Sequence, residues 1–227
     1  MDMYKICHDA KFECGGISIG DPYPFSGKGI PEGCGRPDLR LSCHDGAAMI
    51  EFNQGLGRRY DVKDINPDNR TLRIARQDFK NDLCNPEPED LIFAPTDLFN
   101  DSFPGYVHVT LLYDCPVGNG TFKSFNCDKE GAHYHNVSFE RLLGMPPSPG
   151  DCSASVTVLL QIPLPGNDYQ SVLTSLNEGT VVQWMDTPEC QKCRETHGIC
   201  GFELYQTVCY CRNHQGYFSE CPQGMDL

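Results

Sequence analysis

The chain has 227 residues, with 18 Lys or Arg against 31 Asp or Glu, which gives a formal net charge of −13. This acidic balance disfavours nucleic acid as a partner, because a phosphate backbone is bound through clustered positive charge. The hydrophobic fraction is only 39%, beside 22 Gly and 17 Pro, so we expect a modest core in which cross-links supply much of the stability.

Short strand-like runs fill the first half of the chain. They are LRLSC, AMIEF, RYDVKDI and TLRIAR, separated by the turn signals HDG, NQGLG and NPDN. Runs of this length with regular turns indicate an antiparallel β domain. The clearest strand is YVHVTLLYDC at 106–115, where residues of one face alternate with those of the other from Val107 to Tyr113.

The second half mixes strands with one helix. A short strand ends at Cys127, SVTVLLQIPL at 155–164 is expected to be a buried strand, and TVVQWM is a further strand. The best helix is NDYQSVLTSLNEG, which Asp168 can cap and Gly179 can end. We therefore predict a mainly β, disulfide-rich fold of two small β domains, the second with one helix and a cysteine-rich tail.

The N-terminal segment MDMYKICHDAKFEC lacks the apolar core of a signal peptide. No run approaches the roughly 18 apolar residues of a membrane helix. We expect this chain to be an ectodomain whose targeting and anchoring segments lie outside it, so that it meets a membrane only through a segment absent here.

Fourteen cysteines allow two interpretations. The spacings C-x-x-C and C-x-C between Cys190 and Cys211 can in principle hold zinc. However, zinc ligands cluster, whereas secreted proteins scatter an even number of cysteines to cross-link loops, and a zinc site here would leave Cys200 without a role. We predict no metal site and seven disulfides among Cys7, Cys14, Cys34, Cys43, Cys84, Cys115, Cys127, Cys152, Cys190, Cys193, Cys200, Cys209, Cys211 and Cys221.

Four N-x-[ST] acceptor sites support the same extracellular setting. They lie in polar, turn-like surroundings, which is typical of surface loops in a secreted protein. The predicted glycosylation sites are Asn69, Asn100, Asn119 and Asn136.

Three motifs resemble catalytic or metal sites, but ordinary structural roles explain them better. The G-x-S-x-G pattern at 16–20 is followed by DPYPF, which cannot begin the helix that a hydrolase elbow requires. The pair His133 and His135 has no third ligand, and the acidic run 85–91 lacks the spacing of a calcium loop. Because no nucleophile–base pair or paired carboxylates can be defended, we expect the chain not to be an enzyme.

The stretch from Gly57 to Lys80 is the most informative local feature. It holds seven basic and four acidic residues, a sum of +3 in an acidic chain. Arginine bonds carboxylates bidentately, so Arg58, Arg59 and Arg73 are candidate ligands for a uronic acid, beside the simpler hypothesis of a solvated strand face. Tyr23 and Phe25 are candidate aromatic platforms for a sugar, although aromatics flanked by proline and cysteine are more often core.

Several of these motifs resemble a known family. CGGISIGDPYPF, GCGRPDLRLSC, YDVKDI, TLRIARQDF, LLYDC and FNC occur in the order found in the galacturonan-binding domain of plant wall-associated receptor kinases. LQIPL, LNEGTVVQW and the cysteine-rich stretch from Cys190 to Cys211 resemble the C-terminal domain of leaf-rust-resistance-type receptor-like kinases. The resemblance covers about Cys7 to Cys221 and implies domains over 5–115 and 116–222.

The last cysteines also resemble the end of an EGF-like module. An EGF-like order implies the pairs Cys190–Cys200, Cys193–Cys209 and Cys211–Cys221, which is one of fifteen pairings that six cysteines allow. This pairing rests on analogy.

The resemblance implies the extracellular, wall-facing part of a receptor-like kinase that binds pectin or oligogalacturonide without a cofactor. Calcium can bridge acidic protein to acidic pectin. The alternative is recognition of a protein or peptide ligand, or of a protein co-receptor, in immune or developmental signalling. The family continues into a membrane helix and a kinase, or in some relatives a RING domain, and neither is present in this chain.

Overall fold

The computed structural model describes residues 2–52, 59–80, 82–84, 98–100, 104–115, 123–127, 136–141, 152–163 and 168–222. Strands predominate in these residues, which also contain three helices. The prediction of a mainly β, disulfide-rich fold is confirmed. The histidine pair at 133–135 and the acidic run at 85–91 lie outside the described residues.

The chain forms two compact units, each assembled from separate segments. The first unit comprises Met1–Leu72, Pro95–Phe99 and Gln183–Leu227, and the second comprises Arg73–Ala94 and Asn100–Val182. Because both units are discontinuous, they do not coincide with the sequence segments 5–115 and 116–222. The predicted boundaries divide the chain along its sequence, whereas the two units are defined by contacts in space. The boundaries therefore stay a prediction.

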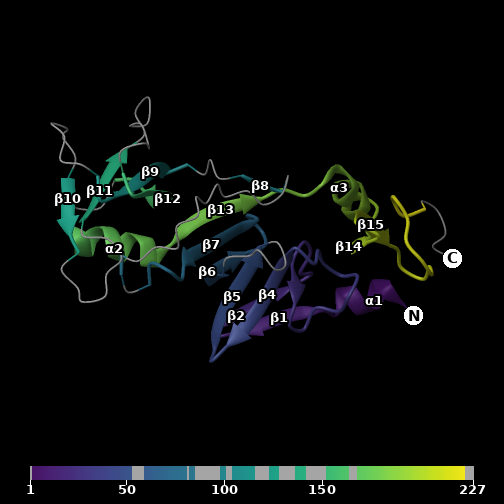
Figure 1. The fold of residues 1–227 in the computed structure, drawn as a ribbon. Coiled ribbons are helices and arrows are strands. Elements are labelled where there is room, and N and C mark those ends of the chain that lie inside the picture. The colour runs from purple at the N-terminus through teal and green to yellow at the C-terminus, as the bar shows by residue number, and fades with distance from the viewer. Residues whose placement is uncertain are drawn as a thin grey trace. The chain divides into compact units, whose positions relative to one another are not determined.

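The N-terminal part of the first unit is a helix followed by short strands (Figure 1). They are α1 (Met3–His8), β1 (Lys11–Cys14), β2 (Ile17–Gly20), β3 (Ser26–Gly27), β4 (Leu39–His44), β5 (Ala47–Phe52) and β6 (Arg59–Asn66). β1 and β2 form an antiparallel hairpin, and β4, β5 and β6 are paired antiparallel in sequence order. One face of this sheet is buried through Leu41, Ile50 and Tyr60, which lie opposite one another on the three strands.

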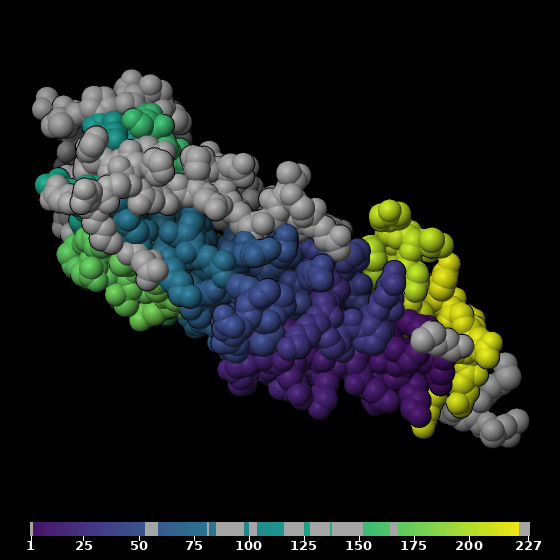
Figure 2. Space-filling view, turned by 60° about the horizontal axis from the view of Figure 1, so that its bottom comes forward, coloured from purple at the N-terminus to yellow at the C-terminus, as the bar shows by residue number. Residues whose placement is uncertain are grey.

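The C-terminal part of the same unit is a cysteine-rich module. It comprises α3 (Pro188–Glu195), β14 (Ile199–Glu203) and β15 (Gln206–Tyr210). Thr187 caps α3 by accepting a hydrogen bond from the Cys190 amide at 3.2 Å, and Pro188 occupies the first turn. The module packs beside the N-terminal residues (Figures 1 and 2), where the Tyr210 hydroxyl donates to the Gly33 carbonyl at 3.2 Å.

The second unit is built on a four-stranded antiparallel sheet in the order β10-β11-β9-β12. Its strands are β9 (Tyr106–Tyr113), β10 (Lys123–Asn126), β11 (Asn136–Arg141) and β12 (Ala154–Gln161). Helix α2 (Tyr169–Glu178) begins at Asp168, which caps it, and covers the sheet through Val172 and Leu176 in a common apolar core. This is the helix predicted from the sequence.

Strands β3 to β6 belong to a seven-stranded sheet in the order β3-β4-β5-β6-β7-β13-β8, which contains three strands not yet described. They are β7 (Thr71–Arg76), β8 (Phe99–Asn100) and β13 (Thr180–Trp184). The division between the units falls inside each of these three strands.

All fourteen cysteines form disulfides, and no cysteine is free. The four pairs outside the tail are Cys7–Cys34, Cys14–Cys43, Cys84–Cys127 and Cys115–Cys152. The three tail pairs are Cys190–Cys200, Cys193–Cys209 and Cys211–Cys221, so the EGF-like pairing is confirmed. The sulfurs of Cys209, Cys211 and Cys221 lie together, but their disulfide bonds leave no thiolate for a metal.

Candidate functional site

The outer face of the first unit's sheet carries a row of charged residues. Arg40 of β4 lies opposite Glu51 of β5, which in turn lies opposite Arg59 of β6. Both arginines are exposed, and neither forms an ion pair within the part of the chain that the structure describes. We call Arg40, Glu51 and Arg59 the arginine row. Its two guanidinium groups are available to an external carboxylate, because neighbouring strands direct these side chains to the same face.

The other predicted arginines do not join this row. Arg58 lies outside the described residues. Arg73 is half-buried in β7, on the opposite face from the buried Leu72 and Ile74 as predicted, and it donates to the Tyr106 hydroxyl at 3.4 Å. Arg73 belongs to the second unit and Arg59 to the first, so only Arg59 of the three predicted arginines is a member of the row.

One more arginine of the basic segment has a structural role. The Arg76 side chain is nearly buried, forms an ion pair with Asp78 and lies over the Phe79 ring at 4.5 Å from its centroid. The simple charge count from Gly57 to Lys80 therefore overstates how much positive charge is free to meet a ligand.

Tyr23 and Phe25 are not the exposed sugar platform proposed for them. Their exposed fractions are 3% and 1%, and the Phe25 ring packs edge-on against Trp184 with centroids 5.0 Å apart. Stacking on a sugar needs an open ring face, which these side chains lack. Ser18 of the G-x-S-x-G pattern lies in the β2 strand of a hairpin, which is not the strand–turn–helix geometry of a hydrolase elbow.

These aromatic residues instead line a cavity of about 310 Å³ in the first unit. Its buried walls are apolar and come from Ile19, Pro22, Tyr23, Phe25, Ile65 and Trp184. Its more exposed lining is largely polar or charged and comes from Gly20, Asp21, Pro67, Asp68, Arg70 and Arg194, with the buried Asp186 beside them. The cavity thus combines an apolar floor with a charged rim.

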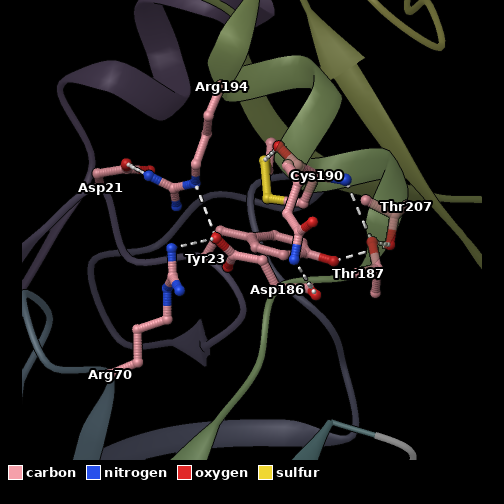
Figure 3. Close-up of polar contacts among 10 residues, drawn as sticks. Asp21, Tyr23, Arg70, Asp186, Thr187, Cys190, Arg194 and Thr207 are labelled. Atoms are coloured by element: carbon pink, nitrogen blue, oxygen red, sulfur yellow. Dashed lines mark hydrogen bonds and ion pairs between the residues drawn. A yellow bond between two sulfur atoms is a disulfide. The ribbon is translucent and has the colours of Figure 1, made fainter.

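Four charged residues form a connected cluster at this cavity (Figure 3). The Asp186 side chain is only 2% exposed, and its Oδ2 lies 2.9 Å from Arg70 Nη2 and 3.6 Å from Arg194 Nε. Arg194 Nη1 reaches Asp21 Oδ2 at 2.6 Å. We call Asp21, Arg70, Asp186 and Arg194 the ion cluster. A buried carboxylate between two guanidiniums avoids the penalty of an unpaired buried charge.

The local fold places each member of the ion cluster. Arg70 ends the turn between β6 and β7 with a left-handed φ of 51°, and its carbonyl accepts from the Trp184 amide at 2.9 Å. Asp186 follows β13 two residues after Trp184. Arg194 projects from α3, which the disulfides of Cys190 and Cys193 hold in place.

The Tyr23 hydroxyl links the cavity wall to the cysteine-rich module. It shares a hydrogen bond of 2.8 Å with Thr207 Oγ1, to which the Thr187 hydroxyl donates at 3.3 Å. Burial raises the pKa of the Tyr23 phenol, the Asp186 carboxylate adds to this shift, and the bond to Thr207 opposes it. The phenol is therefore held neutral as part of the wall.

This cavity was not predicted from the sequence. Arg70 was counted in the basic segment, but Asp21, Asp186 and Arg194 were not singled out, because more than 100 residues separate Asp21 and Arg70 from Asp186 and Arg194. The available signal was weak: Asp186 lies two residues from the only tryptophan, and Asp21 adjoins the buried Pro22.

Two family models match separate parts of the chain. Residues 7–76 match wall-associated receptor kinase galacturonan-binding, and residues 126–214 match wall-associated receptor kinase C-terminal. No solved structure matches. Within the described residues, no helix is long and apolar enough to cross a membrane.

Curated relatives agree with these matches. Leaf rust 10 disease-resistance locus receptor-like protein kinase-like 2.4 of Arabidopsis thaliana is 32% identical over 200 residues, covering 86% of this chain and 30% of the relative. The corresponding protein 2.8 of the same plant is 27% identical, covering 94% of this chain and 23% of the relative. The chain therefore spans less than a third of the length of these two receptor-like kinases.

Proposed function

We propose that this chain, which belongs to the family of wall-associated and leaf-rust-type receptor-like kinases and is an ectodomain of that family, binds pectic polysaccharide of the plant cell wall. The observation that carries the proposal is the match of residues 7–76 to a galacturonan-binding family model. In this proposal, the chain is the extracellular sensing part of a longer receptor. The kinase activity would belong to a part of the receptor outside this chain.

The arginine row gives the proposal a physical basis within the matched segment. Arg40 and Arg59 are exposed and lie two strands apart on one face of the sheet, a backbone separation of about 9.5 Å at the usual strand spacing. That separation suits carboxylates on different rings of one polyuronide chain. A charge-assisted hydrogen bond contributes about 1.5–3 kcal/mol, whereas a fully exposed pair contributes about 0–1 kcal/mol.

The net charge of −13 opposes simple electrostatic capture of an acidic polysaccharide. Two conditions reduce this opposition. Near pH 5 the formal charge of any protein is less negative than at pH 7, because carboxylates and imidazoles take up protons as the pH falls. Calcium bridging protein and pectin carboxylates is the second condition, and it makes binding calcium-dependent.

The test is binding of oligogalacturonides to the secreted chain at pH 5, with and without calcium. Changing Arg40 and Arg59 together to Glu should weaken binding at least ten-fold, and added salt should weaken the parent's binding because the pairs are near the surface. The matched control changes Lys28 and Arg212 to Glu, which alters the net charge equally at exposed positions outside the row. Equal binding by the parent and the Arg40/Arg59 variant contradicts this site.

A protein or peptide ligand is the second candidate function, and one observation favours it. The tip of the β14–β15 hairpin exposes Leu204 by 76% and Tyr205 by 95%, and both adopt left-handed φ angles of 48° and 64°. Side chains other than glycine pay a conformational cost in this region, and leucine and tyrosine are unusual at a tip facing only water. A parent chain that binds no uronide under either calcium condition would favour this candidate.

A further inference from the structure

We propose that the cavity at the ion cluster is a binding subsite for an uncharged sugar ring, so that it prefers a methyl-esterified uronide to an ionised one. This inference rests on the proposed function and deepens it: the arginine row would contact carboxylates, while the cavity would take a neutral ring of the same polysaccharide. Nothing in the family match assigns a ligand to this cavity.

The size and lining of the cavity suit one sugar ring. A volume of about 310 Å³ lies at the lower end of the range of small-ligand pockets, which are mostly apolar with a few well-placed polar groups. The nearly buried Trp184 and Tyr23 contribute only their edges to the apolar walls, and the more exposed lining is polar or charged. A sugar ring has the same two-sided character, with C–H surfaces and a belt of hydroxyl groups.

The charges of the lining favour a neutral ligand. Three carboxylates, those of Asp21, Asp68 and Asp186, face two guanidiniums, those of Arg70 and Arg194, which gives a formal sum of −1. Both guanidiniums are already engaged by cluster carboxylates. The excess negative charge of the site would therefore repel an ionised uronate, whereas it would not repel the uncharged methyl ester.

One polar atom of the ion cluster adds a second observation. Asp21 Oδ1, an acceptor, is buried without a hydrogen-bond partner among the described residues. Buried polar groups are normally satisfied. Sugar hydroxyls both donate and accept, so a hydroxyl of a bound ring can donate to Asp21. Esterified and ionised uronides share these hydroxyls, and the charge of the lining is what distinguishes them.

Trp184 provides a local readout for the test. It is the only tryptophan in the chain and lines the cavity. Its emission should change when methyl-esterified galacturonide oligomers bind the secreted chain. Unesterified oligomers of equal length should bind at least ten-fold more weakly in the assay that reports this change.

Gly20 and Ser18 form a matched pair of positions for blocking the cavity. Both are exposed residues of β2, but only Gly20 lines the cavity, and a Cβ added there meets no atom within 4 Å. Gly20→Phe should weaken binding of the esterified oligomer at least ten-fold, while Ser18→Phe should stay within two-fold of the parent. An unfolding midpoint in urea equal to that of the parent, followed by circular dichroism, confirms that each free variant is folded.

The outcomes separate this inference from the proposed function. Uronide binding that is lost in the Arg40/Arg59 variant, without any Trp184 response in the parent, rejects the cavity subsite alone. A Trp184 response to neutral galacto-oligosaccharides, in a parent that binds no uronide, supports the subsite and rejects pectin as the ligand. Gly20→Phe binding the esterified oligomer as the parent does overturns the inference.

Discussion

Gly198, between α3 and β14, lies against three sulfur atoms of the cysteine-rich module. A Cβ built on it would lie 2.3 Å from Cys209 Sγ, 2.6 Å from Cys193 Sγ and 2.8 Å from Cys221 Sγ. Ordinary contact begins near 3.4 Å, so the closest sulfur must retreat by more than 1 Å. These sulfurs belong to two disulfides, Cys193–Cys209 and Cys211–Cys221, whose covalent bonds restrict that movement.

Gly198→Ala should therefore destabilise the first unit at the upper end of the overpacking range, by about 3 kcal/mol. For a chain of this size, each kcal/mol lowers the Tm by roughly 2–4 °C, so the expected loss is about 6–12 °C. Because α3 carries Arg194, displacement of the helix should also disturb the ion cluster. The variant tests whether the cysteine-rich module supports the cavity wall.

Two other glycines separate crowding from backbone strain. Gly216 has a left-handed φ of 90° with no atom within 4 Å of an added Cβ, and Gly20 has open space without that backbone conformation. Gly216→Ala should cost about 1–2 kcal/mol and Gly20→Ala less than about 0.5 kcal/mol. The assay is urea unfolding with disulfides intact, followed by Trp184 emission. A Gly198→Ala midpoint equal to that of Gly20→Ala would refute the steric argument.

Three further predictions concern single features. Burial is the main cause of the raised pKa values of Tyr23 and Tyr210. Their neutral forms therefore stabilise the fold fully below pH about 10, and this contribution is lost as the pH rises further. Ultraviolet titration should show both phenols ionising only as Trp184 emission is lost, and ionisation at a lower pH contradicts this. Replacing Leu204 by Asn and Tyr205 by Gly should stabilise the chain by about 1 kcal/mol, because these residues suit the left-handed turn; an unchanged urea midpoint argues against strain at the tip. Asn69 is exposed in the β6–β7 turn and should carry a glycan in secreted material, which peptide mapping after glycosidase treatment decides; an unmodified Asn69 beside other modified acceptors contradicts its accessibility.

Local patterns in the sequence were sufficient for most of the strands. TLRIAR forms β7 over the predicted residues, and Tyr106–Tyr113 forms β9, in which both faces are buried from Val109 to Tyr113. Runs rich in β-branched and aromatic residues favour strands locally. The tail disulfides were predicted by analogy with an EGF-like module, because cysteine order alone allows fifteen pairings. These features depend on residues close together in the chain.

Two helices were missed although one had a recognisable start. α3 begins with Thr187 as its cap and Pro188 in the first turn, a standard start signal, but the high density of cysteines there indicated cross-links more strongly than a helix. α1 is only six residues long, too short for hydrophobic periodicity to reveal it. β11 was likewise hidden in a polar stretch that carries the Asn136 acceptor.

The candidate site depends on long-range packing, which explains why composition misjudged it. Tyr23 and Phe25 looked like an aromatic platform because sequence gives residue type without burial. Arg76 looked like free positive charge because its pairing with Asp78 was unseen. Among the described residues, Arg70, Arg76 and Arg194 pair with carboxylates, whereas Arg40 and Arg59 are exposed and form no ion pair, although Glu51 lies opposite both.

The origin of the ion cluster bears on how ligand binding should be measured. Asp21 and Arg70 come from the segment that matches the galacturonan-binding model, whereas Asp186 and Arg194 come from the segment that matches the C-terminal model. The wall residue Trp184 also comes from the second segment. A fragment limited to 7–76 would retain the arginine row and yet lack half of the cavity, with Phe25 deprived of its aromatic neighbour. Binding of ionised uronide to that fragment would therefore be no evidence about the neutral-ring subsite, which exists only where both segments fold together.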